Sequence, residues 1–256
     1  MKTDSISGIG KELLKLYLAQ PSTTVIAGVR DVNHPSVAEL QTLLVGTGSR
    51  LIVLQLDSSS PTDAAAAVSR LQSDFGITKL DTVIANAGIG KYWGLTVDTP
   101  VKEVEEHFEV NSLGPFRLFQ AVQALLFKAS TPRFVVISTV LGSVELQQKM
   151  KIPDVAYGMS KAAVNFFTAK IHHENPHLIA FPIHPGYVQP EDLEDLETDH
   201  LSVDNRWVRT ELGNSIAIAI GAKEASITLP ESAAGVFKQV SNPNRSIEID
   251  SDLTIF

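Results

Sequence analysis

The stretch DTVIANAGIG, residues 81–90, places a β-branched run directly before a series of small residues. Four other runs share its apolar character: TTVIAGV (23–29), RLIVLQL (50–56), RFVVIST (133–139) and LIAFPIH (178–184). Short runs of this composition predict β-strands, and their lack of polar alternation predicts that both faces of the sheet are covered. The sequence therefore indicates a sheet buried between two helical layers.

Helical periodicity fills the intervals between these runs. Apolar residues recur at spacings of three and four in KELLKLYLAQ, VAELQTLL, AAAAVSRLQSDF, VKEVEEHFEV, PFRLFQAVQALL and KAAVNFFTAKI. Strands that alternate with helices are joined by crossovers, which make the strands parallel. We therefore expect residues 1–256 to form one α/β domain, a single doubly wound, Rossmann-type unit with a mostly parallel sheet.

Composition narrows the classes of partner. The 256 residues include no cysteine and carry a net charge of -8, which would repel a nucleic-acid backbone or an anionic membrane. No signal peptide and no apolar run of about 20 residues is present. We expect a soluble, cytoplasmic protein with a small-molecule partner. No metal site is expected, because the adjacent His172 and His173 would point in different directions on a helix.

Two segments depart from the alternating pattern. Only Met1–Thr3 precede DSISGIG, so we expect the first strand to be truncated. Residues 187–206 are crowded with Asp and Glu and lack apolar periodicity, which predicts an acidic loop insertion. This insertion is either a lid over the substrate or an artefact of an imperfect gene model, and the second alternative is favoured.

Several strand ends and one helix start carry residues that suit a nucleotide. Gly8 and Gly10 open the first helix, where free N–H groups and the helix dipole attract phosphate, although an ordinary turn would look the same. Arg30 ends the run 23–29 and could accommodate a 2′-phosphate, or it could simply solvate a strand end. Asn86 follows another strand among small residues that would let a flat cofactor lie on the backbone.

Tyr157 and Lys161 form the pair of side chains best suited to acid/base chemistry. Residues four apart share one face of a helix, and an ammonium group lowers the pKa of a nearby phenol. The pair could act as a general acid/base, but the same spacing also occurs by chance on helix surfaces.

Taken in chain order, the pieces resemble the short-chain dehydrogenase/reductase family over nearly the whole chain. They are the glycine turn, NAG at 86–88, ISTVLG at 137–142, YGMSK at 157–161 and a strand that ends in PG. A Tyr-x-x-x-Lys motif alone is a weak signal, but its place in this order of motifs makes it specific for the family. Along AYGMSKAAVNFFTAKIHHEN and HPG, the sequence is most similar to fungal reductases of the norsolorinic acid ketoreductase type.

The resemblance implies a role for each matching residue. Tyr157 would be the catalytic acid/base, Lys161 would lower its pKa and hold the nicotinamide ribose, and Asn111 would support a water link to solvent. Thr139 would orient the substrate carbonyl, with Ser138 as the alternative, because threonine adds a methyl group to the usual serine hydroxyl. The implied cofactor-binding residues are Gly8, Ile9, Gly10, Arg30, Asp57, Asn86, Ala87, Gly88, Tyr157, Lys161, Pro185, Gly186 and Thr210.

The resemblance also exposes two departures. Asp4 stands where the first glycine of the family's turn belongs, and its carboxylate would repel a pyrophosphate. Joining HPG directly to WVRTELGN would restore the family's usual run, with Thr210 near the cofactor.

Two functions follow from the resemblance. The first is an NADP-dependent ketoreductase, with NAD as the alternative cofactor. It would act in secondary metabolism on a ketone such as an aromatic polyketide intermediate, and would assemble as a homodimer or homotetramer. The second is a catalytically impaired relative that keeps the fold as a binding or regulatory module.

Overall fold

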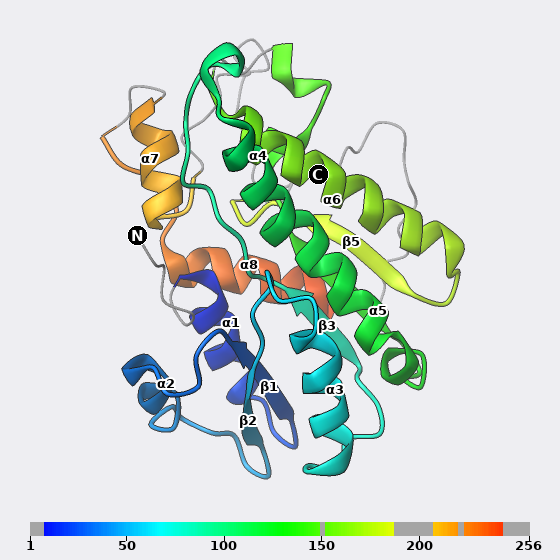
Figure 1. The fold of residues 1–256 in the computed structure, drawn as a ribbon. Helices are drawn as coiled ribbons and strands as arrows, with labels where there is room; N and C mark the ends of the chain where they lie inside the picture. Colours follow the sequence, from blue (N-terminus) through cyan, green and yellow to red (C-terminus); the bar gives the residue numbers. More distant parts are fainter. Residues whose placement is uncertain (1–7, 149–151, 187–206, 220–222, 243–256) are drawn as a thin grey trace.

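A computed structural model of the chain describes residues 8–148, 152–186, 207–219 and 223–242, and it confirms the predicted α/β fold with parallel strands (Figure 1). The predicted runs all form strands. Within the described ranges these are β1 (Thr24–Val29), β2 (Arg50–Gln55), β3 (Thr82–Ala85), β4 (Arg133–Ile137) and β5 (Ile179–Ile183).

Helices connect the strands as the periodicity predicted. They are α1 (Ile9–Leu18), α2 (Pro35–Leu40), α3 (Asp63–Ser73), α4 (Val101–Phe108), α5 (Gly114–Leu126), α6 (Val155–Glu174), α7 (Glu211–Ala219) and α8 (Leu229–Ser241). Short turns of 3-10 helix lie at η1 (Thr96–Asp98), η3 (Val140–Gly142) and η4 (Leu146–Gln148), and a π-helical turn, η2 (Glu109–Leu113), joins α4 to α5. Local sequence sets several starts: α2 and α5 have proline in the first turn, and Thr228 and Glu231 form a capping box at α8.

The strands form two parallel groups. β1 pairs with β2, with Val29 opposite Gln55, and β4 lies between β3 and β5. In the described part of the chain β1 and β3 are not hydrogen-bonded to each other. The truncated first strand and the acidic insertion at 187–206 were predicted for segments that lie outside the described residues.

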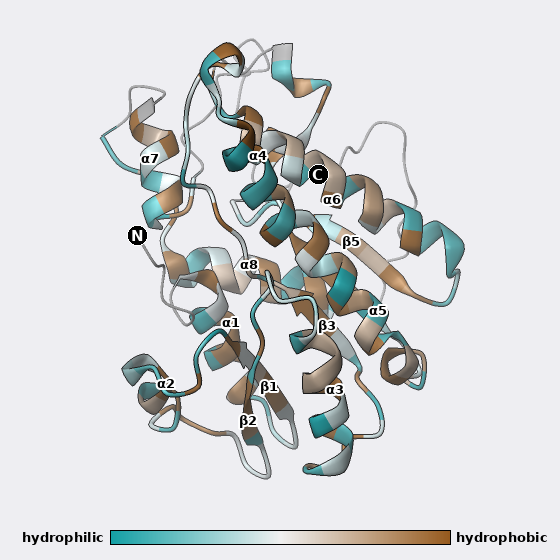
Figure 2. Ribbon diagram, in the orientation of Figure 1, coloured by the Kyte–Doolittle hydropathy of each residue, from teal (hydrophilic) through white to brown (hydrophobic). Residues whose placement is uncertain are grey.

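The larger sheet is covered on both faces, as its apolar strands predicted. Along β4, Phe134 and Val136 pack with α5 and α6, whereas Val135 and Ile137 pack with α1 and α8. This alternation follows from the two-residue repeat of a strand. Figure 2 shows apolar and polar residues together on the helices that cover the sheet.

Helix α1 joins the two strand groups. Leu13 packs in the core with β4, β5 and α8, whereas Leu14 and Leu18 pack in a second core with β1 and α2. Leu18 is fully buried. Successive residues of one helix therefore hold both groups of strands, which fixes the start of α1 relative to the strand ends.

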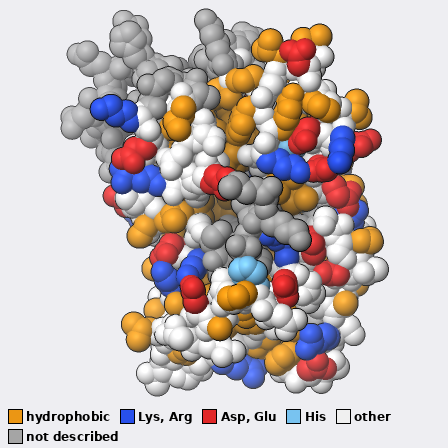
Figure 3. Space-filling view, turned by 60° about the vertical axis from the view of Figure 1, so that its left-hand side comes forward, with side chains coloured by type: hydrophobic (Ala, Val, Ile, Leu, Met, Phe, Trp, Pro, Cys, Tyr) orange, Lys and Arg blue, Asp and Glu red, His pale blue; other side chains and the backbone are white. Residues whose placement is uncertain are grey.

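The surface mixes charges of both signs. Figure 3 shows acidic and basic side chains interspersed on one face of the molecule. Several are paired, as in Lys11–Glu39 at 2.7 Å and Arg70–Asp74 at 3.1 Å. Among the described helices, none is both long and apolar enough to cross a membrane.

Candidate functional site

The start of α1 lies against the end of β3. Gly8 has a φ of +68°, a conformation that favours glycine, and a Cβ on Gly10 would lie 2.5 Å from Nδ2 of Asn86. Cγ2 of Thr210 lies 3.7 Å from the place of a Cβ on Gly8. The structure thus brings together three of the predicted cofactor-binding residues, Gly10, Asn86 and Thr210, around the start of α1. Ile9, also predicted, is the first residue of that helix.

Gly8 is the N-cap of α1 and offers no side chain to cap it. The first N–H groups of a helix have no partner within the helix, so a ligand or solvent must satisfy them. The absence of a competing side chain leaves these groups to an anion.

Asn111 occupies the π-helical turn between α4 and α5. Its side chain makes two bonds to the backbone of Ile89, at 2.8 Å each, and donates a third to Oγ of Ser160 at 2.9 Å. The turn widens the helix locally, and π-helical turns are frequent at functional sites. Asn111 thus links the loop that follows NAG to α6, with the backbone of Gly88 beside its Oδ1.

Tyr157 and Lys161 lie on a buried face of α6. Tyr157 is 5% exposed and Lys161 is 4% exposed. Nζ of Lys161 donates a hydrogen bond to the carbonyl oxygen of Ile137 at 2.8 Å and lies 5.8 Å from the centroid of the Tyr157 ring. The helix therefore places the phenol and the amine together beside the end of β4, as the spacing predicted.

Burial determines the protonation of this pair. It lowers the pKa of Lys161 to about 8, because the charged amine loses water. It raises the pKa of Tyr157, and the nearby carboxyl of Asp154 adds to the increase. The sequence predicted that Lys161 would lower the pKa of Tyr157. In this structure burial moves the pKa of Tyr157 in the opposite direction.

Thr139 and Ser138, at the end of β4, make different contacts. Oγ1 of Thr139 accepts a bond from the N–H of Leu141 at 3.3 Å and so caps η3, whereas Oγ of Ser138 donates to Oδ1 of Asn165 at 2.5 Å. Ser138 therefore holds β4 to α6. The next turn is equally close to that helix, since a Cβ on Gly142 would lie 2.8 Å from the backbone carbon of Lys161.

Arg30 and Asp57 follow the paired strands β1 and β2. In the described ranges no hydrogen bond or ion pair of the Arg30 guanidinium is seen, and its backbone carbonyl accepts a bond from Gln55. Oδ1 of Asp57 instead accepts two bonds from Ser59, at 2.9 and 2.7 Å. The arginine is thus available to a ligand, whereas the aspartate closes a turn.

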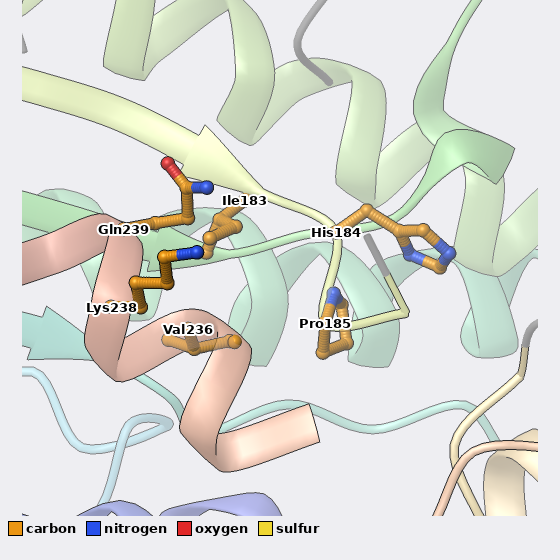
Figure 4. A pocket seen from close by; sticks show the side chains of 7 residues that line it. Ile183, His184, Pro185, Val236, Lys238 and Gln239 are labelled. Carbon is orange, nitrogen blue, oxygen red and sulfur yellow. The ribbon is translucent and has the colours of Figure 1, made fainter. Parts of the chain in front are cut away.

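The predicted Pro185 and Gly186 follow β5. The carbonyl oxygen of Pro185 accepts a bond from Oγ of Ser232 at 2.8 Å, which fixes this turn to α8. Figure 4 shows a small cavity here, of about 50 Å³, between the end of β5 and α8, with the ring of His184 extending away from α8. That ring packs against Trp207, with the centroids 5.6 Å apart.

The sequence analysis missed His107. Its ring is fully buried, accepts the N–H of Lys91 at Nε2 (3.2 Å), and pairs through Nδ1 with the carbonyl of Glu103 at 2.6 Å. The centroid of the ring lies 6.4 Å from that of Tyr157. Its position four residues before Asn111, on the same helix face, was the available signal.

The sequence analysis also missed Asp154 and Trp207, which adjoin the tyrosine. Asp154 precedes α6 and is 5% exposed, and Trp207 packs in the same apolar cluster as Tyr157. Among the described residues neither Oδ2 of Asp154 nor Nε1 of Trp207 has a hydrogen-bond partner. For Asp154, the spacing of three residues to Tyr157 could have revealed it.

A groove of about 350 Å³ lies next to this cluster. Leu141 and Ile152 line the groove and also pack with Tyr157, so they separate its floor from the ring. Its rim carries exposed apolar side chains, Leu95, Val144 and Met159.

Known proteins resemble this chain in sequence and in fold. The family model described as short chain dehydrogenase matches residues 3–200. The norsolorinic acid ketoreductase of Emericella nidulans is 34% identical over 245 residues, which cover 95% of this chain and 85% of the relative. That of Dothistroma septosporum is 36% identical over 246 residues, covering 95% and 84%.

The fold also matches that of a solved oxidoreductase. The NADPH-bound carbonyl reductase from chicken fatty liver matches with a TM-score of 0.71 and 25% identity, over 92% of this chain and 87% of the other. Fold, motif order and relatives agree with the predicted resemblance. The chain therefore belongs to the short-chain dehydrogenase family and is an oxidoreductase.

Proposed function

We propose that the chain is an NADP-dependent ketoreductase in which Tyr157 is the general acid. The observation that carries the proposal is the assembly of Tyr157 and Lys161 beside the end of β4, where Thr139 lies. The glycine turn of α1 meets Asn86 at the neighbouring strand end. The names of the similar ketoreductases and the NADPH-bound carbonyl reductase also support it.

The residues at the strand ends fit a nicotinamide cofactor. A Cβ on Gly10 would collide with Asn86, so glycine lets the start of α1 approach this strand end, and no described side chain caps the N-terminus of α1. The guanidinium of Arg30 has no hydrogen bond or ion pair among the described residues and would meet the 2′-phosphate that distinguishes NADP from NAD. The other residues that would hold the cofactor are Gly8, Ile9, Asn86, Ala87, Gly88, Lys161, Pro185, Gly186 and Thr210. When bound, the reduced nicotinamide supplies a hydride to the carbonyl carbon.

The chain's own residues manage the oxygen and its proton. The hydroxyl of Thr139 donates a hydrogen bond to the carbonyl oxygen, and the hydroxyl of Tyr157 gives its proton to that oxygen as the alcohol forms. The ammonium group of Lys161 stabilises the phenolate that remains until solvent returns a proton. The raised pKa of Tyr157 suits this direction, because it keeps the phenol protonated at neutral pH.

Apolar walls near the site favour a substrate of low polarity. The ring of Trp93 lies 6.0 Å from that of Tyr157, between centroids, and the adjoining groove has an apolar rim. We infer a ketone of moderate size. An aromatic polyketide intermediate of secondary metabolism is suggested by the names of the relatives.

Exposed aromatic side chains on α5 and α6 favour a homodimer or homotetramer. Phe116 is 41% exposed and Phe166 is 74% exposed, and Phe116 packs on Phe167 at 5.4 Å between centroids. Pairing through these helices would remove the aromatic side chains from water.

The proposal is tested first by cofactor binding and then by turnover. NADPH should raise the melting temperature, because a ligand that binds only the folded chain stabilises it. The loaded enzyme should reduce aryl ketones, and Tyr157→Phe should lower turnover by about 100- to 10,000-fold, which is the usual contribution of general acid catalysis.

The outcomes separate the two functions. Tyr157→Phe should leave the affinity for NADPH nearly unchanged, since the phenyl ring keeps its packing. Normal turnover by this variant would defeat the mechanism. No response to millimolar NADPH would instead favour the impaired binding protein.

A further inference from the structure

Three buried ionisable groups lie at the start of α6. Asp154 is the N-cap residue, and Tyr157 and Lys161 follow within the helix, four residues apart on one side. Each of the three is at most 5% exposed. Along the chain the phenol therefore stands between a carboxyl group three residues before it and an amine four residues after it, and Nζ of the amine lies 5.8 Å from the centroid of the phenol ring.

The backbone of Asp154 is fixed in place, and one oxygen of its carboxyl has no hydrogen bond among the described residues. Its backbone is held by bonds from its own N–H to the carbonyl of Ile152 at 3.0 Å and from the N–H of Gly158 to its carbonyl at 2.7 Å. A Cβ on Gly158 would lie 3.0 Å from Oδ2 of Asp154. In the described part of the chain Oδ2 itself is buried without a hydrogen bond. A buried carboxylate oxygen without a hydrogen bond is costly, and a charge in a site that excludes water acts strongly on its neighbours.

Few charges are available to compensate it. Helix α4 packs against α6, and its least exposed ionisable side chains include Glu103, which is also acidic, and His107, whose pKa is lowered by burial. On α6 the amine of Lys161 donates to Ile137 instead. Glu145 and Asp98, on the adjoining loops, are exposed acids.

We propose that Asp154 acts through Tyr157 as a positioning residue, whose negative charge disfavours the phenolate and so keeps the site in its proton-donating form. Lys161 and Asp154 then act in opposite directions on one hydroxyl. Their balance sets the pH at which the site changes from reducing ketones to oxidising alcohols. This inference rests on the proposed function for its consequence, but the electrostatic coupling itself can be measured without turnover.

The protonation of the two groups agrees with the geometry. Burial raises the pKa of Asp154 to about 6, so the carboxyl is mostly ionised at neutral pH. After burial, the charge of Asp154 is the second cause that raises the pKa of Tyr157. The coupling should therefore weaken as the pH falls below the pKa of Asp154.

A fluorinated tyrosine incorporated at position 157 gives a direct readout in the cofactor-free chain. Fluorine makes the phenol more acidic, and its ¹⁹F resonance reports ionisation. Asp154→Asn keeps the shape and removes the charge, and it should lower the midpoint of the titration by about one pH unit. Asp154→Glu restores the charge and should restore the original midpoint. Asp98→Asn, a matched change at an exposed carboxylate, should leave it unchanged.

The loaded enzyme gives the second readout. In Asp154→Asn the pH dependence of alcohol oxidation should shift to lower pH by a similar amount. An unchanged ¹⁹F midpoint in Asp154→Asn overturns the inference, as does an equal shift in Asp98→Asn. Absence of any turnover alongside a shifted midpoint would defeat the proposed function and leave the coupling intact.

Discussion

The two halves of the molecule are built from different interactions. Around β1, β2 and the helices α1, α2 and α3, every buried side chain is apolar. All of the buried polar and charged side chains among the described residues lie between His107 and Ser232. One half is thus an apolar sandwich, and the other contains a buried polar network around α6.

The difference indicates how each half would treat a ligand. In the α6 half, bonds such as Asn111–Ser160 and Ser138–Asn165 fix the side chains near Tyr157 before any substrate arrives. Preorganised polar groups in a buried site stabilise developing charge without a reorganisation cost. In the β1–β2 half, the polar residues just after the strands, Arg30 and Asp57, are only half-buried. Affinity there should depend on backbone groups and on single side chains such as Arg30.

The largest expected effect separates Thr139 from its neighbour in the polar half. Thr139→Ala should lower turnover about 100-fold, as loss of one donor to a reacting oxygen typically does. Ser138→Ala should retain turnover. It should instead reduce the free energy of unfolding by about 1–3 kcal/mol, because Oδ1 of Asn165 loses its buried donor. Steady-state kinetics and urea denaturation measure the two effects.

The control for this pair is Thr139→Ser, which keeps the hydroxyl and the bond to Leu141. It should restore turnover to within a few-fold of the original. A hundredfold loss in Ser138→Ala with normal turnover in Thr139→Ala would reverse the assignment.

A pair of glycine substitutions compares the packing of the halves. A Cβ on Gly142 would lie 2.8 and 2.9 Å from backbone atoms of Lys161 and Ala162, which cannot move without shifting α6. We expect Gly142→Ala to cost about 2–3 kcal/mol of unfolding free energy, as overpacking usually does. A Cβ on Gly10 would meet the end of a flexible side chain, that of Asn86, so Gly10→Ala should cost less than about 1 kcal/mol. Equal losses would mean that the halves do not differ in rigidity.

The sequence predicted elements and motifs better than it predicted electrostatics. The apolar runs identified all of the described strands, because a strand whose two faces are both covered by helices consists mainly of apolar residues. The spacing of Tyr157 and Lys161 was sufficient to place them together, since helix geometry fixes residues four apart. The pKa of Tyr157 was wrong in direction, because burial depends on side chains such as Trp93 and Trp207 that are distant in the chain.

Residues whose role depends on distant contacts were also missed. In the sequence His107 looked like any polar residue of an amphipathic helix. Its burial depends on the loop after NAG, where the N–H of Lys91 donates a hydrogen bond to its ring. Asp154 lay in a stretch without periodicity, so only its spacing of three residues to Tyr157 pointed to it, and the pattern did not predict its burial. Asp57 was among the predicted cofactor-binding residues, yet its carboxylate accepts two hydrogen bonds from Ser59 and closes a turn.

The smallest expected effect tests the β1–β2 half. Arg30→Ala should weaken NADPH binding about tenfold, or about 1.4 kcal/mol, because a charge-assisted bond to the 2′-phosphate would be lost. NADH has no such phosphate, so its affinity should not change. Arg50→Ala is the matched control: Arg50 lies at the opposite end of the same strand pair, opposite Thr24. Fluorescence titration with both cofactors distinguishes the outcomes. Equal weakening of NADPH and NADH in Arg30→Ala would show a general loss of structure at the end of β1, and the preference for NADP would then have to come from another residue.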